Sequence, residues 1–262
     1  MARSSASPRA AAPVAVARRG RPPAKGRGPA GPATLGPLAI FEAALALIDE
    51  QGLAAFNIRA LAARLGVAPA AIYWHVPNRD ALVSGAIALM LGGMDGGVAP
   101  ASSWQQTIAA LLRGFRDALR LHPGLAPAVA SELAYNAAFD APLLEHVVGA
   151  LKAAGFRGDA LVDAFNVVIA AMCGFATLEL SSAPTEASQA WQEAIQGRIE
   201  GIDRQRHPYL HGERAALRNR AFLLRWSDGV DAPLQSGFDA WVDVIVRGLE
   251  ARSRALGRAA CA

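Results

Sequence analysis

The chain has 262 residues, of which 53% are hydrophobic, and a formal net charge of +4. This composition is ample for a hydrophobic core in one or two domains. The two cysteines, Cys173 and Cys261, are far apart and fit no metal-ligand spacing, so we expect no disulfide framework and no metal, as in a reducing, cytoplasmic compartment. The longest apolar run, from Val167 to Leu178, is too short to cross a bilayer, so we expect no membrane partner.

The first 34 residues differ in composition from the rest of the chain. They contain seven basic and no acidic residues, which leaves a net charge of −3 for the remainder. Because this segment is rich in Pro, Gly, Ala and Ser and has no aromatic residue, it cannot bury enough surface to fold alone. We therefore predict a disordered basic tail over residues 1–34. An arginine-rich N-terminus without acidic residues is also a property of organelle transit peptides.

A short motif within the tail, Arg18-Arg19-Gly20-Arg21-Pro22-Pro23, is similar to the core of an AT-hook. Glycine and proline keep such a backbone thin and extended, and arginines favour the negative potential of a narrow minor groove. Arg19 and Arg21 are therefore candidate DNA contacts. The alternative is a solvated basic linker whose arginines touch phosphates without reading sequence; either mode weakens with salt.

The segment from Asn57 to Leu82 predicts a helix-turn-helix. Leu61 and Leu65 have helical spacing, Gly66 suits a tight turn, and Pro69 suits the first position of the next helix. Asn57 is a candidate cap for the first of these helices. The second ends in Tyr73-Trp74-His75, three rings that are too many for the small buried face of a short helix. Some of them must contact a partner, which for a helix-turn-helix is usually double-stranded DNA.

These residues resemble the tetracycline-repressor (TetR) family over about residues 38 to 95. The resemblance lies in the order of a helix, a glycine, a short helix, a Leu-Gly-Val turn and Ile-Tyr-Trp-His-Val, followed by an asparagine and Ala-Leu. It implies a DNA-binding domain over residues 35–95 and a helical domain over residues 100–256. The second domain is expected to bind an effector and to form a homodimer through two C-terminal helices. The function implied is a ligand-responsive repressor that binds a palindromic operator.

The predicted DNA-binding domain carries a net charge of −2 over residues 38–95, so contacts must come from placed groups. Arg59 is positioned to reach a guanine edge or a phosphate. Tyr73 and His75 are candidate phosphate donors, although Tyr73 alternatively packs under the first helix with only its hydroxyl free. For Trp74, groove contact and intramolecular packing are equally compatible with the sequence.

The start of each helix in this domain adds further candidates. The free N–H groups after Asn78, with Arg79, predict an anion site at a helix N-terminus. Ala70 and Ala71 stand where TetR relatives often carry polar side chains, which leaves thymine methyl groups as their possible contacts. Ala68 replaces an expected capping serine or threonine, an omission worth roughly 1 kcal/mol of helix stability.

From Trp104 onward the apolar spacing is helical, with no alternating strand pattern, so the fold class is predicted to be all α. Predicted helices cover residues 105–121, 142–154, 160–180, 186–206 and 238–255. Two of these are apolar on more than one side, which favours a dimer interface, although a large single-domain core would look the same. The candidate interface residues are Phe165, Ile169, Phe238, Trp241, Val242, Ile245 and Leu249.

An effector cavity lined by apolar and aromatic side chains is expected in the same domain. The candidates are Trp104, Phe115, Met172, Phe175 and Trp191, with His146, Asn166 and Glu179 as orienting polar groups. Each of these residue types is more often part of a core than of a binding site. The apolar lining predicts a small hydrophobic or aromatic effector, and no histidine spacing selects a metal.

An enzyme is not expected, because the chain has no phosphate-binding glycine loop, nucleophile elbow, HExxH motif or convincing catalytic carboxylate pair. No cofactor is expected either. The alternative to a regulator is an architectural, largely nonspecific DNA-binding protein driven by the basic tail.

Overall fold

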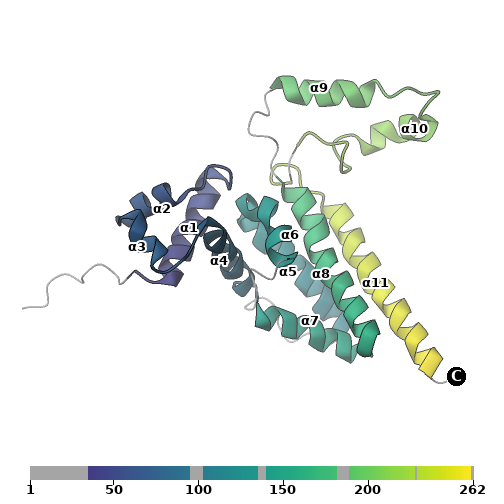
Figure 1. Cartoon of the computed structure of the whole chain (residues 1–262). Helices are drawn as coiled ribbons and strands as arrows, with labels where there is room; N and C mark the ends of the chain where they lie inside the picture. Colours follow the sequence, from purple (N-terminus) through teal and green to yellow (C-terminus); the bar gives the residue numbers. More distant parts are fainter. Residues whose placement is uncertain (1–34, 95–102, 135–139, 182–188, 228, 261–262) are drawn as a thin grey trace, which may run out of the picture. The chain divides into compact units, whose positions relative to one another are not determined.

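The computed structural model describes residues 35–94, 103–134, 140–181, 189–227 and 229–260, and all of its regular elements are helical (Figure 1). The predicted all-α class is thereby confirmed. In chain order the elements are α1 (Pro37–Gln51), α2 (Ile58–Leu65), α3 (Pro69–Tyr73), α4 (Arg79–Gly92), α5 (Trp104–Leu121), the 3-10 turn η1 (Pro123–Leu125), α6 (Ala126–Ala134), α7 (Ala141–Ala153), α8 (Gly158–Leu180), α9 (Gln189–Glu200), α10 (Pro208–Leu217) and α11 (Gln235–Ala260).

From Gly36 onward the chain forms one compact unit. The predicted basic tail, with Arg19 and Arg21, lies outside the described residues, as do Cys261 and most of the segment between the two predicted domains. The domain division at residues 35–95 and 100–256 therefore stays a prediction.

The boundaries of the first helices follow from capping chemistry. The Asn57 side chain accepts a hydrogen bond from the Ala60 N–H at 3.0 Å, and the Asn78 side chain accepts one from the Ala81 N–H at 2.8 Å. Gly66 ends α2 in the left-handed region at φ +67°, where a side chain would be strained. α3 begins at Pro69, and Ala68 provides no side-chain cap, as predicted.

α1 packs against α4 and supports the helix-turn-helix from behind. Its buried side chains are Ile40, Ala44, Leu47 and Ile48. A Cβ atom on Gly85 of α4 would lie 2.3 Å from the Phe41 ring of α1. Glycine at this position therefore allows the close approach of the two helices.

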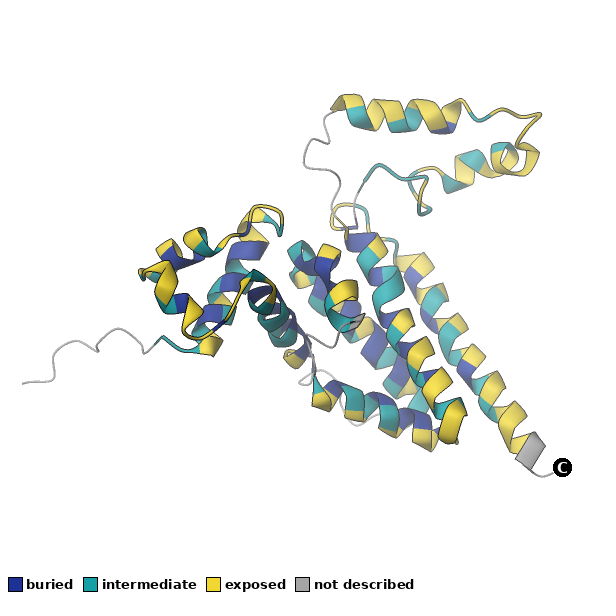
Figure 2. Ribbon diagram, viewed as in Figure 1, coloured by how far each residue is buried: buried dark blue, intermediate teal, exposed yellow. Residues whose placement is uncertain are grey.

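α5, α7, α8 and α11 pack on one another in the C-terminal part, and α6 packs on α8. Figure 2 shows their buried residues in dark blue on the facing sides of these helices. α8 is long and apolar enough to cross a membrane by length and composition alone, a property that the shorter apolar run in the sequence did not reveal. Because α8 contacts four other helices, a core or interface role explains its apolar character.

Two features of the helical pattern differ from the sequence prediction. The helix predicted over residues 186–206 ends earlier, because α9 stops at Glu200, next to Gly201. α6 and α10 were not predicted. Both begin next to a proline after a short turn, and both are too short for a clear 3.6-residue period.

Candidate nucleic-acid interface and apolar cavity

The end of α3 presents aromatic side chains to solvent. Ile72 and Val76 are 0% and 2% exposed and hold the short helix against its neighbours. Between them the chain turns, and Trp74 is 88% exposed while Tyr73 is 51% exposed. His75 is exposed as well. Trp74 therefore does not pack within the described chain, and Tyr73 exposes much more than its hydroxyl group.

Arg59 and Tyr73 come together at a surface hollow of about 520 Å³. Its walls are formed by the start of α2, the end of α3 and the first residue of α4, namely Asn57, Ile58, Arg59, Tyr73 and Arg79. Ala70 is exposed and Ala71 is half-buried on the same short helix. The arrangement offers the exposed guanidinium of Arg59 beside the phenol of Tyr73, and the exposed indole of Trp74 follows Tyr73 in the chain, a set of groups that suits contact with a polyanion that has stacked bases.

The prediction that Arg79 supplies an anion site needs correction. Its Nη2 donates to the Leu53 carbonyl at 2.7 Å and its Nε donates to the Phe56 carbonyl at 3.2 Å. The guanidinium also lies 5.6 Å from the centre of the Phe56 ring. Arg79 thus ties the start of α4 to the α1–α2 connection, a long-range contact without a local sequence signal.

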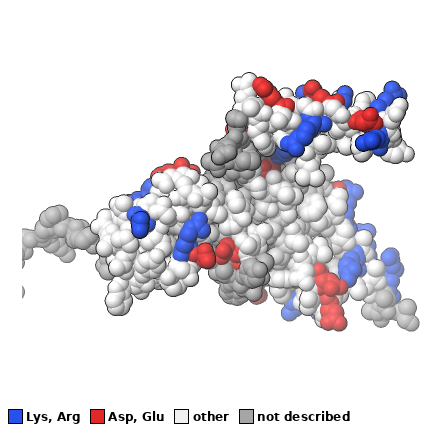
Figure 3. Space-filling model, turned by 45° about the horizontal axis from the view of Figure 1, so that its top comes forward, with Lys and Arg blue, Asp and Glu red and all other residues white. Residues whose placement is uncertain are grey.

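Charges of both signs cover α1 to α4 (Figure 3), the helices that are predicted to bind DNA and are called the DNA-binding helices below. On the face shown in Figure 3, the basic side chains of these helices do not merge into one patch. Arg64 of α2 donates to Glu50 of α1 at 2.7 Å, so this arginine serves the packing of the two helices. Direct charge attraction by the described residues is therefore modest, in agreement with the net charge of −2 predicted from the sequence.

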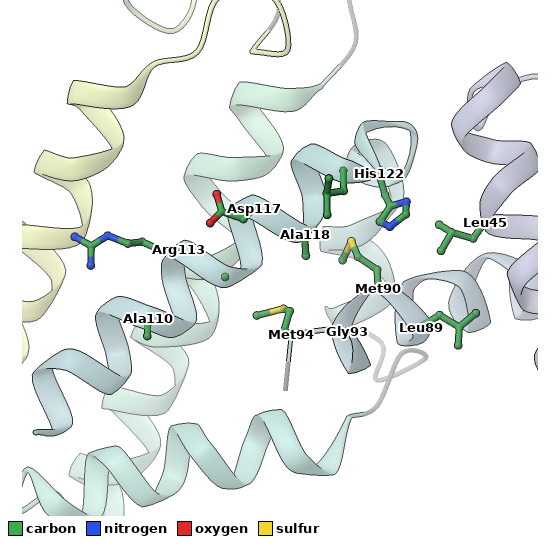
Figure 4. A pocket seen from close by; sticks show the side chains of 12 residues that line it. Leu45, Leu89, Met90, Gly93, Met94, Ala110, Arg113, Asp117, Ala118 and His122 are labelled. Carbon is green, nitrogen blue, oxygen red and sulfur yellow. The ribbon is translucent and has the colours of Figure 1, made fainter. Parts of the chain in front are cut away.

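A cavity of about 540 Å³ lies between α4 and α5, with α1 at one side (Figure 4). Figure 4 shows the Met90, Met94 and His122 side chains directed into the space between these helices. The cavity is lined by Leu45, Leu89, Met90, Gly93, Met94, Ala110, Arg113, Gly114, Asp117, Ala118, Leu121 and His122. Its walls are mostly apolar, and its polar groups are Arg113, Asp117 and His122, a composition that suits an organic molecule with few polar groups.

None of the eight predicted effector-binding residues lines this cavity, so their role as effector contacts stays a prediction. Phe115 is absent from the lining because it is fully buried on the opposite face of α5. Met172 is buried in α8, and Asn166 is exposed on its outer side. His146 lies on the surface, where its Nδ1 is 2.8 Å from the Pro142 carbonyl.

The other predicted effector residues also have different surroundings. Phe175 stacks edge-on against Phe222 and Phe238, with centroid distances of 5.0 and 5.5 Å. Trp104 is the half-buried first residue of α5. Glu179 and Trp191 both line a small cavity of about 120 Å³.

Glu179 forms a buried ion pair with Arg116, a partner that the sequence analysis missed. Two hydrogen bonds of 2.6 and 2.7 Å join the guanidinium to the carboxylate, and the Leu234 N–H donates to the same carboxylate at 2.7 Å. Burial alone raises the pKa of Glu179, but these hydrogen bonds and the charge of Arg116 bring it below its ordinary value. Glu179 is therefore a structural link between α5, α8 and the start of α11.

The predicted dimer-interface residues divide into two groups. Phe238, Val242 and Leu249 of α11 are at most 4% exposed, so they belong to the core of one chain, and their prediction as interface residues was wrong. The Trp241 indole N–H donates to the Ala171 carbonyl of α8 at 3.2 Å. Phe165, Ile169 and Ile245 remain half-buried at the surface.

Exposed apolar side chains do occur on the same two helices, at Val162, Val167 and Leu178 of α8 and Val244 of α11. These positions alternate with the buried ones along each helix. The sequence pattern could not separate the inner face of each helix from the outer one, and an interface on α8 and α11 stays a prediction.

Comparison with known proteins identifies the family. Residues 40–86 match the bacterial regulatory proteins of the tetR family, and residues 97–230 match the tetracyclin repressor-like C-terminal domain. The chain belongs to the TetR family. The resemblance predicted from the helix-turn-helix is thus confirmed, and it extends into the C-terminal domain.

Curated TetR relatives match in part of their length. An HTH-type transcriptional regulator of Saccharopolyspora erythraea is 34% identical over 47% of this chain and 52% of its own length. The class A tetracycline repressor from transposon 1721 of Escherichia coli is 34% identical over 36% of this chain and 47% of its own. The chain thus spans about half the length of the curated relatives it matches.

Solved TetR structures share the fold. The TetR family protein ActR of Streptomyces coelicolor, in complex with actinorhodin, superposes with a TM-score of 0.64 over 84% of this chain and 99% of its own, at 20% identity. At this identity the likeness concerns the fold. Within the described residues no cluster of histidine, cysteine and carboxylate side chains is suited to a metal ion.

Proposed function

We propose that this TetR-family protein is a ligand-responsive transcriptional repressor that recognises its operator through α2, α3 and the start of α4. The observation that carries the proposal is the exposure of Tyr73, Trp74 and His75 at the end of α3, where Tyr73 shares a surface hollow with Arg59. Solvent-exposed aromatic rings at this density are costly for a surface without a partner. The alanines at the start of α3 leave few hydrogen bonds to base edges, so recognition would rely on these rings, on Arg59 and on DNA shape.

A homodimer would place two such surfaces on one palindromic operator, since one short helix reads too few base pairs for useful specificity. Val167 and Leu178, which lie about three turns apart on one face of α8, and Val244 on α11 are exposed apolar side chains, and they support an interface formed by these helices. Family members typically dimerise, and α8 and α11 pack directly on each other within the chain. A cytoplasmic setting fits this role.

The cavity between α4 and α5 is the proposed effector site. It is large enough for a polycyclic aromatic molecule, and it is bounded by helices of both the DNA-binding and the C-terminal parts. ActR has been solved with actinorhodin and with (S)-DNPA, which supports small organic molecules as the class of ligand. An occupant would release DNA only if it favours an arrangement in which the two α3 helices no longer match the operator.

Selection of DNA from a random library with the full chain, followed by footprinting, tests the proposal. We expect one discrete footprint with two-fold sequence symmetry. Uniform protection of all sequences would instead support an architectural protein driven by the basic tail.

A further inference from the structure

One histidine belongs both to the cavity and to a polar link with the DNA-binding helices. His122 follows α5 and lines the cavity between α4 and α5. Its Nδ1 lies 2.8 Å from a carboxylate oxygen of Asp49, near the end of α1.

The backbone on both sides of this link is well fixed. The His122 N–H donates to the carbonyls of Ala118 and Leu119, and its own carbonyl accepts from Leu125 in η1. A Cβ atom on Gly124 would lie 2.8 Å from the Ile48 carbonyl, so η1 packs directly against the last turn of α1. The imidazole can change its position by side-chain rotation alone, whereas its backbone cannot easily follow.

We propose that His122 transmits occupancy of the α4–α5 cavity to the DNA-binding helices through its hydrogen bond with Asp49. This proposal rests on the proposed effector function of the cavity. An apolar or aromatic occupant displaces the imidazole, the bond to Asp49 is lost, and α1 with its partner α4 is released from η1. His122 and Asp49 are thus positioning residues for operator recognition, although neither is part of the α3 surface.

The magnitude of the effect follows from the exposure of the pair. Both side chains keep about a quarter of their surface in water, 26% for His122 and 28% for Asp49. A hydrogen bond to a charged group in such a place is worth less than a buried one, so its loss should account for about a 3- to 10-fold part of the coupling.

Filling the cavity with a covalent group tests the proposal without knowledge of the natural effector. Ala118 lines the cavity and is half-buried, so a cysteine at this position can be labelled with benzyl methanethiosulfonate in a background with Cys173→Ala and Cys261→Ala. Affinity for a DNA duplex selected by the full chain is measured with and without the label. With Asp49 present, we expect labelling to weaken operator binding by about 10-fold or more.

The decisive variant is Asp49→Ala, since Asp49 does not line the cavity. We expect the effect of the label on operator affinity to fall about 3- to 10-fold in this variant. An unchanged effect of the label would overturn the role of the His122–Asp49 bond while leaving the effector site intact. No effect of the label even with Asp49 present would overturn the effector site itself, and the inference with it.

Two controls separate this bond from other losses. Glu50→Ala removes the neighbouring carboxylate of α1, whose 2.7 Å partner Arg64 lies within the DNA-binding helices. Ser84→Ala removes the 2.5 Å bond between α4 and Glu132 of α6, which does not involve the cavity lining. Both controls should keep the full effect of the label, and Asp49→Asn, which retains an acceptor oxygen, should restore most of it.

Discussion

Two polar pairs join the second half of α5 and its C-terminal cap to different neighbours, one through a buried ion pair and one through a partly exposed histidine–aspartate hydrogen bond. Arg116 and Glu179 join α5 to α8 inside the helical bundle, with side chains that are 4% and 0% exposed. His122 and Asp49 join the end of α5 to α1, with side chains that are about a quarter exposed. The buried pair fixes one arrangement, because its separation would leave a charge without water. The hydrogen bond between His122 and Asp49 can break at a small cost in free energy, because both side chains reach water. This suits a contact between α5 and α1 that must change between two states.

The bundle pair should give the largest loss of stability. Glu179→Gln leaves the buried Arg116 without its counter-charge, and we expect the free energy of unfolding to fall by about 3 to 5 kcal/mol. Chemical denaturation at pH 7 measures this. Asp163→Asn, which breaks the exposed pair with Arg252, is the matched control and should cost at most about 1 kcal/mol. Equal losses in the two variants would remove the distinction between buried and exposed pairs.

The same pair predicts a pH dependence with a definite sign. The pKa of Glu179 lies below its ordinary value of 4.5 because its hydrogen bonds and Arg116 outweigh the effect of burial. The unfolded carboxyl group therefore takes up its proton at higher pH than the folded one. The stability that Glu179 contributes is complete above about pH 4.5 and is lost as the pH falls through the folded pKa. The difference in unfolding free energy between the parent chain and Glu179→Gln should shrink below pH 4.5. A difference that stays constant with pH would contradict a lowered pKa of Glu179 in the folded chain.

Close packing between α1 and α4 predicts an intermediate effect. Gly85→Ala places a methyl group against the Phe41 ring, and we expect a loss of about 1 to 2 kcal/mol despite the better helix propensity of alanine. In a Phe41→Ala background the sign should reverse, with a gain of up to about 1 kcal/mol. Thermal unfolding of the four proteins provides the comparison. A loss of the same size in both backgrounds would show that Phe41 is not the obstacle.

Loss of the His122–Asp49 hydrogen bond should have the smallest effect on stability. Asp49→Ala is expected to change the free energy of unfolding by less than about 1 kcal/mol, because its bond to His122 is partly solvated. If Asp49→Ala lowers the free energy of unfolding as much as Glu179→Gln does under the same denaturation conditions, the His122–Asp49 bond is as important for stability as the buried Arg116–Glu179 pair.

Local chemistry explains which parts of this structure the sequence predicts. Asn57, Gly66, Pro69 and Asn78 determine helix starts and stops through their own backbones and side chains, so their roles were readable without a fold. Contacts between residues far apart in the sequence could not be predicted in this way. The sequence predicts that Arg79 contacts DNA, yet its guanidinium donates to the α1–α2 connection, 23 to 26 residues away in sequence.

The same limit applies to the cavity. The large apolar residues of α5 follow one helical face, which predicts that Phe115 faces the core, but the spacing does not show that Ala110 and Ala118 on the other side line a cavity with α4. Arg116, in the middle of the buried face, reads as a surface residue until its partner Glu179 is placed, 63 residues later.

Operator affinity of Trp74→Ala tests the central claim, that the end of α3 is the DNA-reading surface. Because Trp74 is 88% exposed, the substitution should leave the melting temperature unchanged. Fluorescence anisotropy measures the affinity of each variant for a selected operator duplex and for a scrambled duplex, and the ratio of the two gives the specificity. Tyr209→Ala is the control, because Tyr209 of α10 is also an aromatic residue and is 90% exposed. We predict that Trp74→Ala loses about 5- to 150-fold in operator affinity while Tyr209→Ala keeps it. Unchanged operator affinity in Trp74→Ala, or an equal loss in both variants, would contradict the claim.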